Sequence, residues 1–215
     1  MHHAAPLIEQ RGARATWYAS GALQGTHSEH FGPMFEPADL RRLASKGHDI
    51  GCHTFDHVDC ARVNEAEMRA QSARNQSFLR AHGVSDIKSF AYPYGNVDLA
   101  AKQVLASSGM ALRAITARTN RGSVDLGMLK AIGLQDDKGG TRRALKALER
   151  LNQTDGWLIL FTHDVRPDPS SWGVTPEAYQ HLLQAIDASG AEIVTVADMV
   201  GRVEPQLGRR PQMAA

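Results

Sequence analysis

Residues 47–57 read GHDIGCHTFDH, a short apolar strand followed at once by two histidines. The run DIGCH, 49–53, predicts a buried strand. His53 and His57 are four residues apart, and on one turn of helix that spacing brings two imidazoles to one metal ion. Such pairs are also common on surfaces, so one histidine could instead be a core or capping residue. Their place at the end of a strand favours a metal site.

Two further predicted strands end in unusual residues. FAYPYG, 90–95, closes a strand with a tight turn, and by itself it is typical of a simple turn with two packing aromatic rings. ILFTHDV, 159–165, places His163 at the end of the most hydrophobic strand. Histidine suits proton transfer near neutral pH. A rim histidine satisfied by its neighbours is the alternative interpretation of His163.

The rest of the chain alternates short apolar runs with amphipathic stretches. Strands are predicted over 15–20, 49–53, 89–93, 111–117, 129–134, 157–163 and 192–200, the last running into a short helix. Helices are predicted over 3–11, 37–46, 64–81, 97–108, 141–152 and 175–189. Strands that alternate with crossover helices form a parallel sheet. An open doubly wound sheet and a (β/α) barrel both fit, and both carry their chemistry at the carboxyl ends of strands.

Length and composition predict one globular unit. The 215 residues divide into a domain over 1–200 and a flexible C-terminal tail over 201–215. The net charge of +1 argues against nucleic acid or an anionic membrane as the main partner. No apolar run approaches the roughly 20 residues of a membrane span. No signal peptide is visible, so a cytoplasmic location is expected for the chain as given, although an export signal could lie upstream.

In this order and spacing, the three strand ends resemble a known family, the polysaccharide deacetylases with a NodB homology domain, similar to carbohydrate esterase family 4. HTFDH resembles the metal motif of that family, His-Ser/Thr-x-x-His, and HDIGCH resembles the run into it. FAYPYG resembles its third motif, and ILFTH its last. LIEQRGARATWYAS, 7–20, resembles the stretch just after the first motif, so the resemblance extends from about residue 4 to residue 200.

The resemblance implies an α/β fold, a distorted (β/α) barrel of about seven parallel strands. It implies a divalent metal, usually zinc, held by His53, His57 and an aspartate. A second aspartate would be the general base, and the backbone amide of Tyr94 would stabilise the oxyanion. His163 would be the general acid that protonates the departing amine.

The chain departs from the family pattern in two places. The first motif of the family is an aspartate pair at the end of strand one, and only Met1 and His2 precede the first predicted helix. We therefore expect the first strand to be missing, either by truncation of a full enzyme, which we favour, or by natural loss. Asp136 and Asp137 form another pair, but in a later part of the barrel. Ala91 stands where the third motif often has the arginine that orients the base.

Other residues allow weaker interpretations. Cys52 and Cys60 flank the histidines, so a Cys-His-His-Cys zinc site is conceivable, but Cys52 and His53 should face opposite sides of a strand. Trp172 could line a sugar site or pack its own loop down. The polar loop 21–36 is expected to form a substrate rim.

Three functions follow from these observations. The first is a metal-dependent hydrolase that removes acetyl groups from N-acetylated sugars or related small amides by cleaving a C–N bond. The second is a non-catalytic carbohydrate- or metal-binding domain on the same scaffold, because the catalytic aspartates are absent. The third is a metal-free structural protein. The missing strand also predicts a gap in the barrel, a self-association contact, or a wall filled by a chain terminus.

Overall fold

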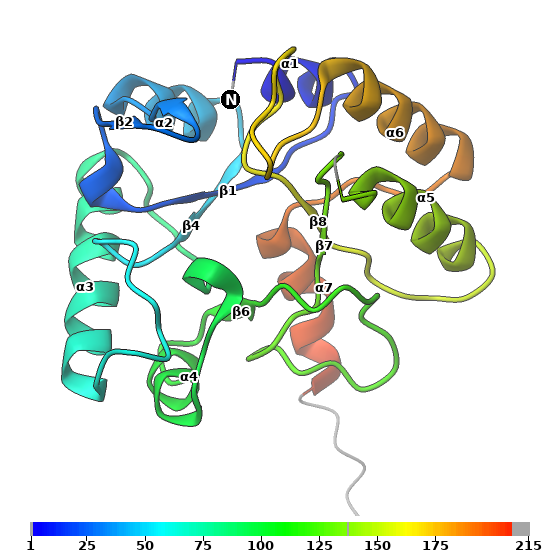
Figure 1. The fold of residues 1–215 in the computed structure, drawn as a ribbon. Coiled ribbons are helices and arrows are strands. Elements are labelled where there is room, and N and C mark those ends of the chain that lie inside the picture. The colour runs from blue at the N-terminus through cyan, green and yellow to red at the C-terminus, as the bar shows by residue number, and fades with distance from the viewer. Residues whose placement is uncertain (1, 137, 208–215) are drawn as a thin grey trace, which may run out of the picture.

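A computed structural model describes residues 2–136 and 138–207 of the chain, and Figure 1 shows the arrangement of their helices and strands. The helices are α1 (Ala4–Glu9), α2 (Pro37–Ser45), α3 (Glu65–Ala81), α4 (Leu99–Ala106), α5 (Gly140–Leu151), α6 (Pro176–Ser189) and α7 (Val196–Leu207). The strands are β1 (Thr16–Ala19), β2 (His27–Ser28), β3 (Gly32–Pro33), β4 (Asp49–Cys52), β5 (Ser89–Ala91), β6 (Ala111–Arg113), β7 (Ile132–Gly133) and β8 (Leu160–Phe161). None of the described helices has the length and apolar character needed to cross a bilayer.

The main sheet is parallel and has the order β1-β4-β5-β6. A single bridge from Arg113 to Leu129 extends it toward a second parallel pair, β7 and β8. The helices lie outside the strands, with α2, α3 and α4 beside the main sheet and α5 and α6 beside β7 and β8 (Figure 1). Parallel strands joined by outer helices are the α/β architecture that the sequence predicts.

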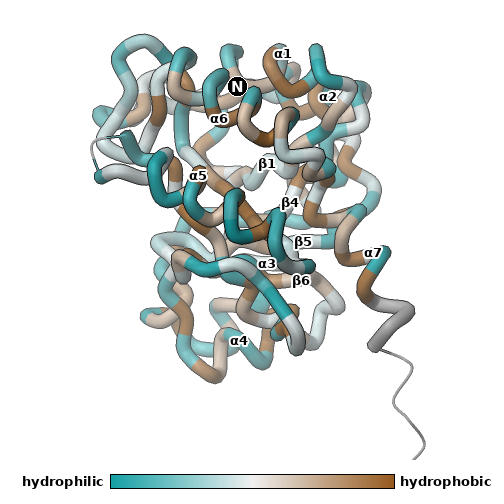
Figure 2. The backbone as a smooth tube through the Cα atoms, turned by 90° about the vertical axis from the view of Figure 1, so that its right-hand side faces the viewer, coloured by the Kyte–Doolittle hydropathy of each residue, from teal (hydrophilic) through white to brown (hydrophobic). Residues whose placement is uncertain are grey.

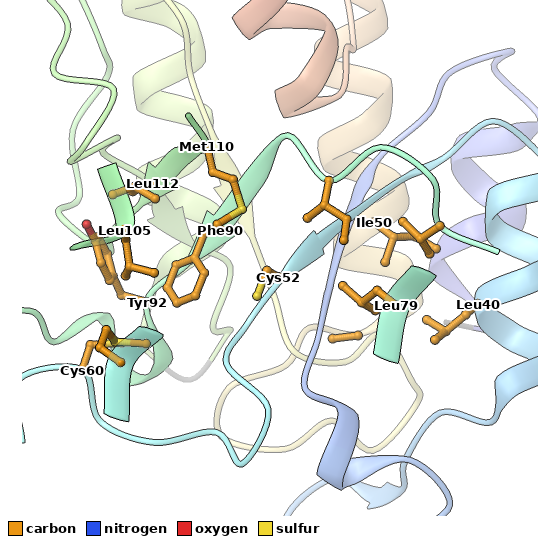
Figure 3. Packing of buried hydrophobic residues seen from close by; sticks show 14 of the residues in the cluster. Leu40, Ile50, Cys52, Cys60, Leu79, Phe90, Tyr92, Leu105, Met110 and Leu112 are labelled. Carbon is orange, nitrogen blue, oxygen red and sulfur yellow. The ribbon is translucent and has the colours of Figure 1, made fainter. Parts of the chain in front are cut away.

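One face of the main sheet packs against helices. Side chains alternate along a strand, so Cys52, Phe90 and Leu112 share this face, and all three are fully buried. Figure 3 shows them packed with Leu79 of α3 and Leu105 of α4. Burying an apolar side chain of this size stabilises the fold by about 1.5–3 kcal/mol. Figure 2 shows the same pattern for the whole chain, with apolar segments turned inward and hydrophilic ones on the outer turns.

The opposite face of the sheet is more polar and points to the interior of the strand array. Tyr18 and Gly51 are register partners on β1 and β4. The ring of Tyr18 lies where a Cβ on Gly51 would be, so only glycine lets it cross β4. Ala91 and Arg113 are register partners on β5 and β6. This face therefore combines small residues on the middle strands with long polar side chains from the outer ones.

Helix α3 begins as its sequence predicts. The Oδ1 atom of Asn64 accepts the Glu67 N–H at 2.9 Å, which caps the helix. The carboxylate of Glu67 instead accepts a hydrogen bond from Gln71, at 2.9 Å. Asn64 and Glu67 have the spacing of a capping box, but a contact within the helix replaces the bond that Glu67 would return to the Asn64 backbone.

The predicted strand over 192–200 is wrong. Residues 191–195 form no strand, and α7 begins at Val196. The Val196 N–H donates to the Thr16 side-chain oxygen at 2.8 Å and not to a backbone carbonyl of β1. The Oγ1 atom of Thr195 accepts the Asp198 N–H at 3.0 Å, so this side chain starts a helix where the apolar run suggested a strand.

The predicted boundary at residue 200 falls inside a helix. Helix α7 continues to Leu207, so residues 201–207 are helical and not a frayed tail. Val196 and Val200 are buried, which anchors the helix. The rest of the predicted tail, 208–215, lies outside the described residues.

In the part of the chain that the structure describes, β1 pairs with β4 on one side and with no strand on the other. The contact between Thr16 and Val196 lies at this edge. The C-terminal segment therefore approaches the place where the sequence predicts a missing strand. Self-association along the edge stays a prediction.

Candidate active site

His53 and His57 lie in an irregular turn at the carboxyl end of β4. The turn is not the helical turn that their spacing suggested, because Thr54 and His57 have left-handed φ angles of 57° and 54°. Tyr94, with φ 58°, is the third described residue other than glycine in this conformation. Each such residue costs about 1–3 kcal/mol unless its surroundings enforce it, and such residues cluster at functional sites.

Side chains from three parts of the fold hold this turn in place. The Gln71 Oε1 atom accepts the N–H groups of Phe55 at 3.1 Å and Asp56 at 2.8 Å. The Ser20 hydroxyl donates to the carbonyl oxygen of His53 at 2.6 Å. Thr54 accepts the Val58 N–H through its own hydroxyl at 3.1 Å. Partly buried hydrogen bonds therefore fix the backbone of the turn that carries both imidazoles.

The two imidazoles lie side by side, with ring centroids 4.8 Å apart and planes at 74°. The Nδ1 atom of His53 lies 2.7 Å from the carbonyl oxygen of Ala91. A carbonyl only accepts, so Nδ1 carries the proton and the Nε2 lone pair is free, as in histidines that bind metals. Burial lowers the pKa of His53 well below 6.5 and also lowers the pKa of His57. Both rings are then neutral at neutral pH, the form that coordinates a metal.

These residues fit part of a metal coordination shell. Two neutral imidazoles suit zinc and similar divalent ions. Within residues 2–136 and 138–207, no group of three or more His, Cys, Asp or Glu side chains could hold a metal ion. The chain as described thus provides two neutral ligands without a carboxylate.

The alternative Cys-His-His-Cys site is wrong. Cys52 and Cys60 are both fully buried. The sulfur of Cys52 accepts from the Asn75 side chain of α3 at 3.2 Å, on the helix side of the sheet, whereas His53 faces the interior. Alternation along the strand separates the two side chains, as the sequence predicts.

Asp136 has a structural role. Its carboxylate accepts from the Thr141 hydroxyl at 2.7 Å and from the Thr175 N–H at 3.1 Å, which ties together the starts of α5 and α6. Asp137 lies outside the described residues. Asp136 is therefore not a substitute for the first family motif.

Tyr94 has an unused backbone donor, and its aromatic ring lies beside His57. Its ring centroid lies 4.8 Å from that of His57. Among the described residues, no hydrogen bond uses the Tyr94 N–H. Gly95, at φ 73°, completes the turn, and a Cβ there would collide with Ile115. The geometry suits a backbone donor for developing negative charge on a substrate oxygen.

A hollow of about 520 Å³ opens next to these residues. His57, Asp59, Arg62 and Tyr94 contribute to its lining. Asn96 donates to Asp59 at 3.0 Å and steadies one wall. A hollow that combines apolar walls, charged groups and an exposed aromatic ring at its edge can accommodate a sugar.

His163 follows β8 and lies beneath the loop 21–36. Its ring stacks on Phe31 of that loop at 5.3 Å, with the planes 9° apart. Arg166 donates to the carbonyl oxygen of Phe31 at 3.0 Å and fixes the loop there. Trp172 lies 6.1 Å from His163 on another side. The loop therefore covers the histidine, while its role as a substrate rim stays a prediction.

His163 is connected to the histidine pair through aromatic rings and Arg113. Its ring centroid lies 6.1 Å from that of Phe161, and Arg113 lies over the rings of both Phe161 and Tyr18. The Tyr18 ring centroid lies 6.3 Å from that of His53. Burial lowers the pKa of His163, and the charge of Arg113 lowers it further. Its role as general acid stays a prediction.

Arg113 and Gln71 belong to none of the motifs in the sequence. Arg113 ends the apolar strand ALR, 111–113, and a charged residue at that position was the available signal. Its guanidinium carbon lies 4.8 Å from the Phe161 ring centroid and 5.2 Å from that of Tyr18. Gln71 lies inside a long helix, and no sequence pattern shows that it reaches a distant turn.

Comparison with known proteins identifies the family. A family model described as polysaccharide deacetylase matches residues 1–112, more than half of the chain. The chain is 32% identical over 90 residues to a peptidoglycan-N-acetylglucosamine deacetylase of Bacillus cereus. That match covers 42% of this chain and 30% of the relative, so the chain spans less than a third of the relative's length.

Solved structures share the fold. A family 4 acetyl xylan esterase from Clostridium thermocellum, in complex with a cobalt ion, has a TM-score of 0.63 at 19% identity, covering 97% of this chain and 89% of that one. A carbohydrate esterase family 4 pseudoenzyme from Bacillus anthracis has a TM-score of 0.62 at 14% identity, covering 93% and 59%. The chain therefore belongs to the polysaccharide deacetylase family and has its NodB-like (β/α) barrel fold.

Proposed function

We propose that this chain is a metal-dependent deacetylase domain that hydrolyses the acetamide group of N-acetylated sugars or related small amides. One observation carries the proposal: His53 presents a free Nε2 lone pair beside His57, whose ring in turn contacts the ring of Tyr94. A metal ligand pair and a backbone donor are thus adjacent at the carboxyl ends of two strands.

Each residue has a distinct task in this proposal. His53 and His57 would hold a divalent cation, zinc in our expectation, which polarises the substrate carbonyl and lowers the pKa of water. The Tyr94 N–H donates a hydrogen bond to the carbonyl oxygen as it gains negative charge. His163 would deliver to the nitrogen of the departing amine the proton that the attacking water releases.

The hollow beside Tyr94 would bind the sugar. Tyr94 is 62% exposed and Trp172 is 44% exposed, so both offer aromatic faces to a sugar ring. Lys138 lies 3.8 Å above the Trp172 ring and holds it against the loop. The Bacillus cereus relative acts on an N-acetylated sugar, which supports an amide substrate.

A non-catalytic sugar- or metal-binding domain is the second candidate. The observation that favours it is that no carboxylate joins the two histidines among the described residues. A general base contributes about 10²–10⁴-fold to a rate, so its loss would remove most activity. The fold similarity to a pseudoenzyme is compatible with this candidate.

Acetate release distinguishes the two candidates. The purified chain, stripped of metal and then given zinc or cobalt, is incubated with N-acetylglucosamine oligomers, and released acetate is measured. Metal-dependent release that the double substitution His53→Ala/His57→Ala abolishes supports the deacetylase. Oligomer binding without release supports the binding domain.

A further inference from the structure

Helix α5 has positive charge concentrated on its outer side. Its cationic face, as we call it, consists of four exposed residues, Arg142, Arg143, Lys146 and Arg150. At 3.6 residues per turn these cations fall within an arc of about 100°. The buried residues Ala144 and Leu148 lie on the opposite side of the helix, so the charge is directed to solvent. Glu149 is the one acidic residue of α5.

The cationic face has no opposite charge that neutralises it. Within residues 2–136 and 138–207, none of the ion pairs includes a basic residue of α5. Arg142, Lys146 and Arg150 follow one another at intervals of four residues, a spacing at which like charges destabilise a helix. Helix α3 instead pairs Glu65 with Arg69 at this spacing. The stability of α5 therefore does not explain its charges.

The first turn of α5 is also unfavourably charged. It contains Arg142 and no acidic residue, and Lys138 lies just before the N-cap, Gly139. The positive end of the helix dipole favours anions at this position and disfavours cations. An anionic ligand that lies along the helix would relieve this repulsion and the repulsion among the cations themselves.

The cationic face begins beside the candidate active site. The Nζ atom of Lys138 lies 3.8 Å from the centroid of the Trp172 ring, which lies 6.1 Å from that of His163. A hollow of about 280 Å³, lined in part by Trp172, opens there. Helix α5 then extends for about 18 Å. At its far end Arg121 adds a further cation, because it donates to the carbonyl oxygen of Arg150 at 3.0 Å.

We propose that Lys138 and the cationic face bind a glycan strand with repeated negative charges, which continues over Trp172 to the active-site histidines. That the polymer is a glycan rests on the proposed function, and the substrate is then an acidic, N-acetylated one. A bilayer fits less well, because α5 has no exposed large apolar side chain to insert between lipids. The opposite charges of strand and helix supply the attraction.

Oligosaccharide binding tests the proposal without catalysis. Hyaluronan oligomers, in which N-acetylglucosamine alternates with glucuronate, are compared with uncharged N-acetylglucosamine oligomers of equal length. Calorimetric titration of the metal-free chain at low ionic strength gives both affinities. Hyaluronan should bind at least about tenfold more tightly, and added salt should reduce the difference by screening the charges. Equal affinity for the two oligomers would overturn the proposal.

A triple substitution in α5 tests where the anion binds. Arg142→Gln/Lys146→Gln/Arg150→Gln should lower hyaluronan affinity about tenfold, the combined effect of three exposed ion pairs. Arg143 stays intact because it donates to the carbonyl oxygen of Lys138. The thermal midpoint should not fall, since the substitutions remove the repulsion along the helix.

The matched control removes three exposed cations elsewhere. Arg41→Gln/Lys46→Gln/Arg80→Gln changes the net charge equally, at α2 and α3 on the other side of the strands (Figure 1). Its hyaluronan affinity should equal that of the wild-type chain. Equal losses in both triple variants would attribute binding to net charge and contradict the proposal.

Tryptophan fluorescence tests the continuation to the active site. Hyaluronan should change the emission of the wild-type chain and leave that of Trp172→Phe unchanged, because the other two tryptophans are less exposed. Binding without an emission change in the wild-type chain would contradict a strand that passes over Trp172.

Two other polyanions complete the test. Vesicles that contain phosphatidylglycerol and a short DNA duplex are titrated under the same conditions. Binding of either through α5, without preference for hyaluronan over the uncharged oligomer, would overturn the proposal in favour of a membrane or a nucleic acid. None of these measurements depends on acetate release. A chain that releases no acetate but selects hyaluronan through α5 would contradict the deacetylase and support the cationic face as a glycan site.

Discussion

His53 donates its Nδ1 hydrogen to the carbonyl oxygen of Ala91 across 2.7 Å, which links the end of β4 to the end of β5. This bond fixes the tautomer of the imidazole and turns its Nε2 atom away from β5. Because the carbonyl belongs to the strand that leads into the Tyr94 turn, one hydrogen bond sets the relative position of the metal-ligand pair and the backbone donor.

Gln71 should control metal affinity without touching the metal. Gln71→Met keeps the volume but leaves the N–H groups of Phe55 and Asp56 without their acceptor. We expect zinc affinity to fall about 10- to 100-fold, the range found for residues that orient ligands. The free energy of unfolding should fall by about 1–3 kcal/mol. Calorimetric titration and denaturant unfolding measure the two effects.

Gln76→Met is the matched control for that experiment. Gln76 lies on the same helix and its side chain contacts Ser72, away from the turn. Its replacement should leave zinc affinity unchanged. Equal losses of zinc affinity in Gln71→Met and Gln76→Met would mean that the substitutions act by perturbing helix α3 and not the turn that carries His53 and His57.

Gly95→Ala should distort the Tyr94 turn. A left-handed φ of 73° and contact with Ile115 both oppose a Cβ at this position. We expect a loss of about 1–3 kcal/mol in the free energy of unfolding, together with slower acetate release. Adding Ile115→Ala should restore the share of the unfolding free energy that is lost through the collision. The backbone cost of about 1 kcal/mol should remain. No recovery in the double variant would show that Ile115 does not limit the turn.

His163→Gln should slow acetate release and leave zinc binding unchanged. A proton donor contributes about 10²–10⁴-fold to the rate, and glutamine cannot replace it. The measurement is kcat for acetate release at saturating zinc. The control is the kcat of His181→Gln, which changes an exposed histidine of α6. Full activity in His163→Gln would assign the proton transfer to another group.

The metal-free protein should lose stability as the pH falls below about 6.5. The Nδ1 atom of buried His48 accepts the Ala15 N–H at 3.0 Å, so its ring is neutral in the folded chain, and burial lowers its pKa from 6.5. On acidification the unfolded chain binds this proton first, so the free energy of unfolding falls as the pH drops through this range.

A single substitution isolates the contribution of His48. His48→Asn keeps an acceptor for the Ala15 N–H but cannot titrate. The slope of unfolding free energy against pH, which counts the protons taken up on unfolding, should therefore decrease by the equivalent of at most about one proton. His181→Asn should leave the slope unchanged because that histidine is exposed. An unchanged slope in His48→Asn would mean that His48 titrates alike in both states.

Most of the fold was predictable because it depends on local patterns. Apolar runs in the sequence indicate the strands at 49–53 and 89–93, and Asn64 indicates the start of α3. The structure contains all three features. The strand predicted over 192–200 is wrong because its apolar run suits either a strand or a helix. The hydrogen bond that the Val196 N–H donates to distant Thr16, together with the Thr195 cap, decides between them. Periodicity alone cannot distinguish these cases.

The site was predictable only in its motif residues. The spacing of His53 and His57 indicates proximity, but the left-handed turn between them depends on Gln71 and Ser20, which lie elsewhere in the sequence. Arg113 reaches the interior because its partner on the neighbouring strand, Ala91, is small. The register that pairs these two residues cannot be predicted from the sequence of either strand alone.

A cobalt titration tests the central claim, that His53 and His57 together hold one divalent cation. Cobalt absorbs visible light when protein ligands bind it, so binding and stoichiometry are read from one spectrum. The account predicts one bound ion per chain, displaced by zinc, with affinity at least about 100-fold lower in His53→Ala and in His57→Ala and unchanged in His181→Ala. Equal binding by the wild-type chain and both site variants would contradict it.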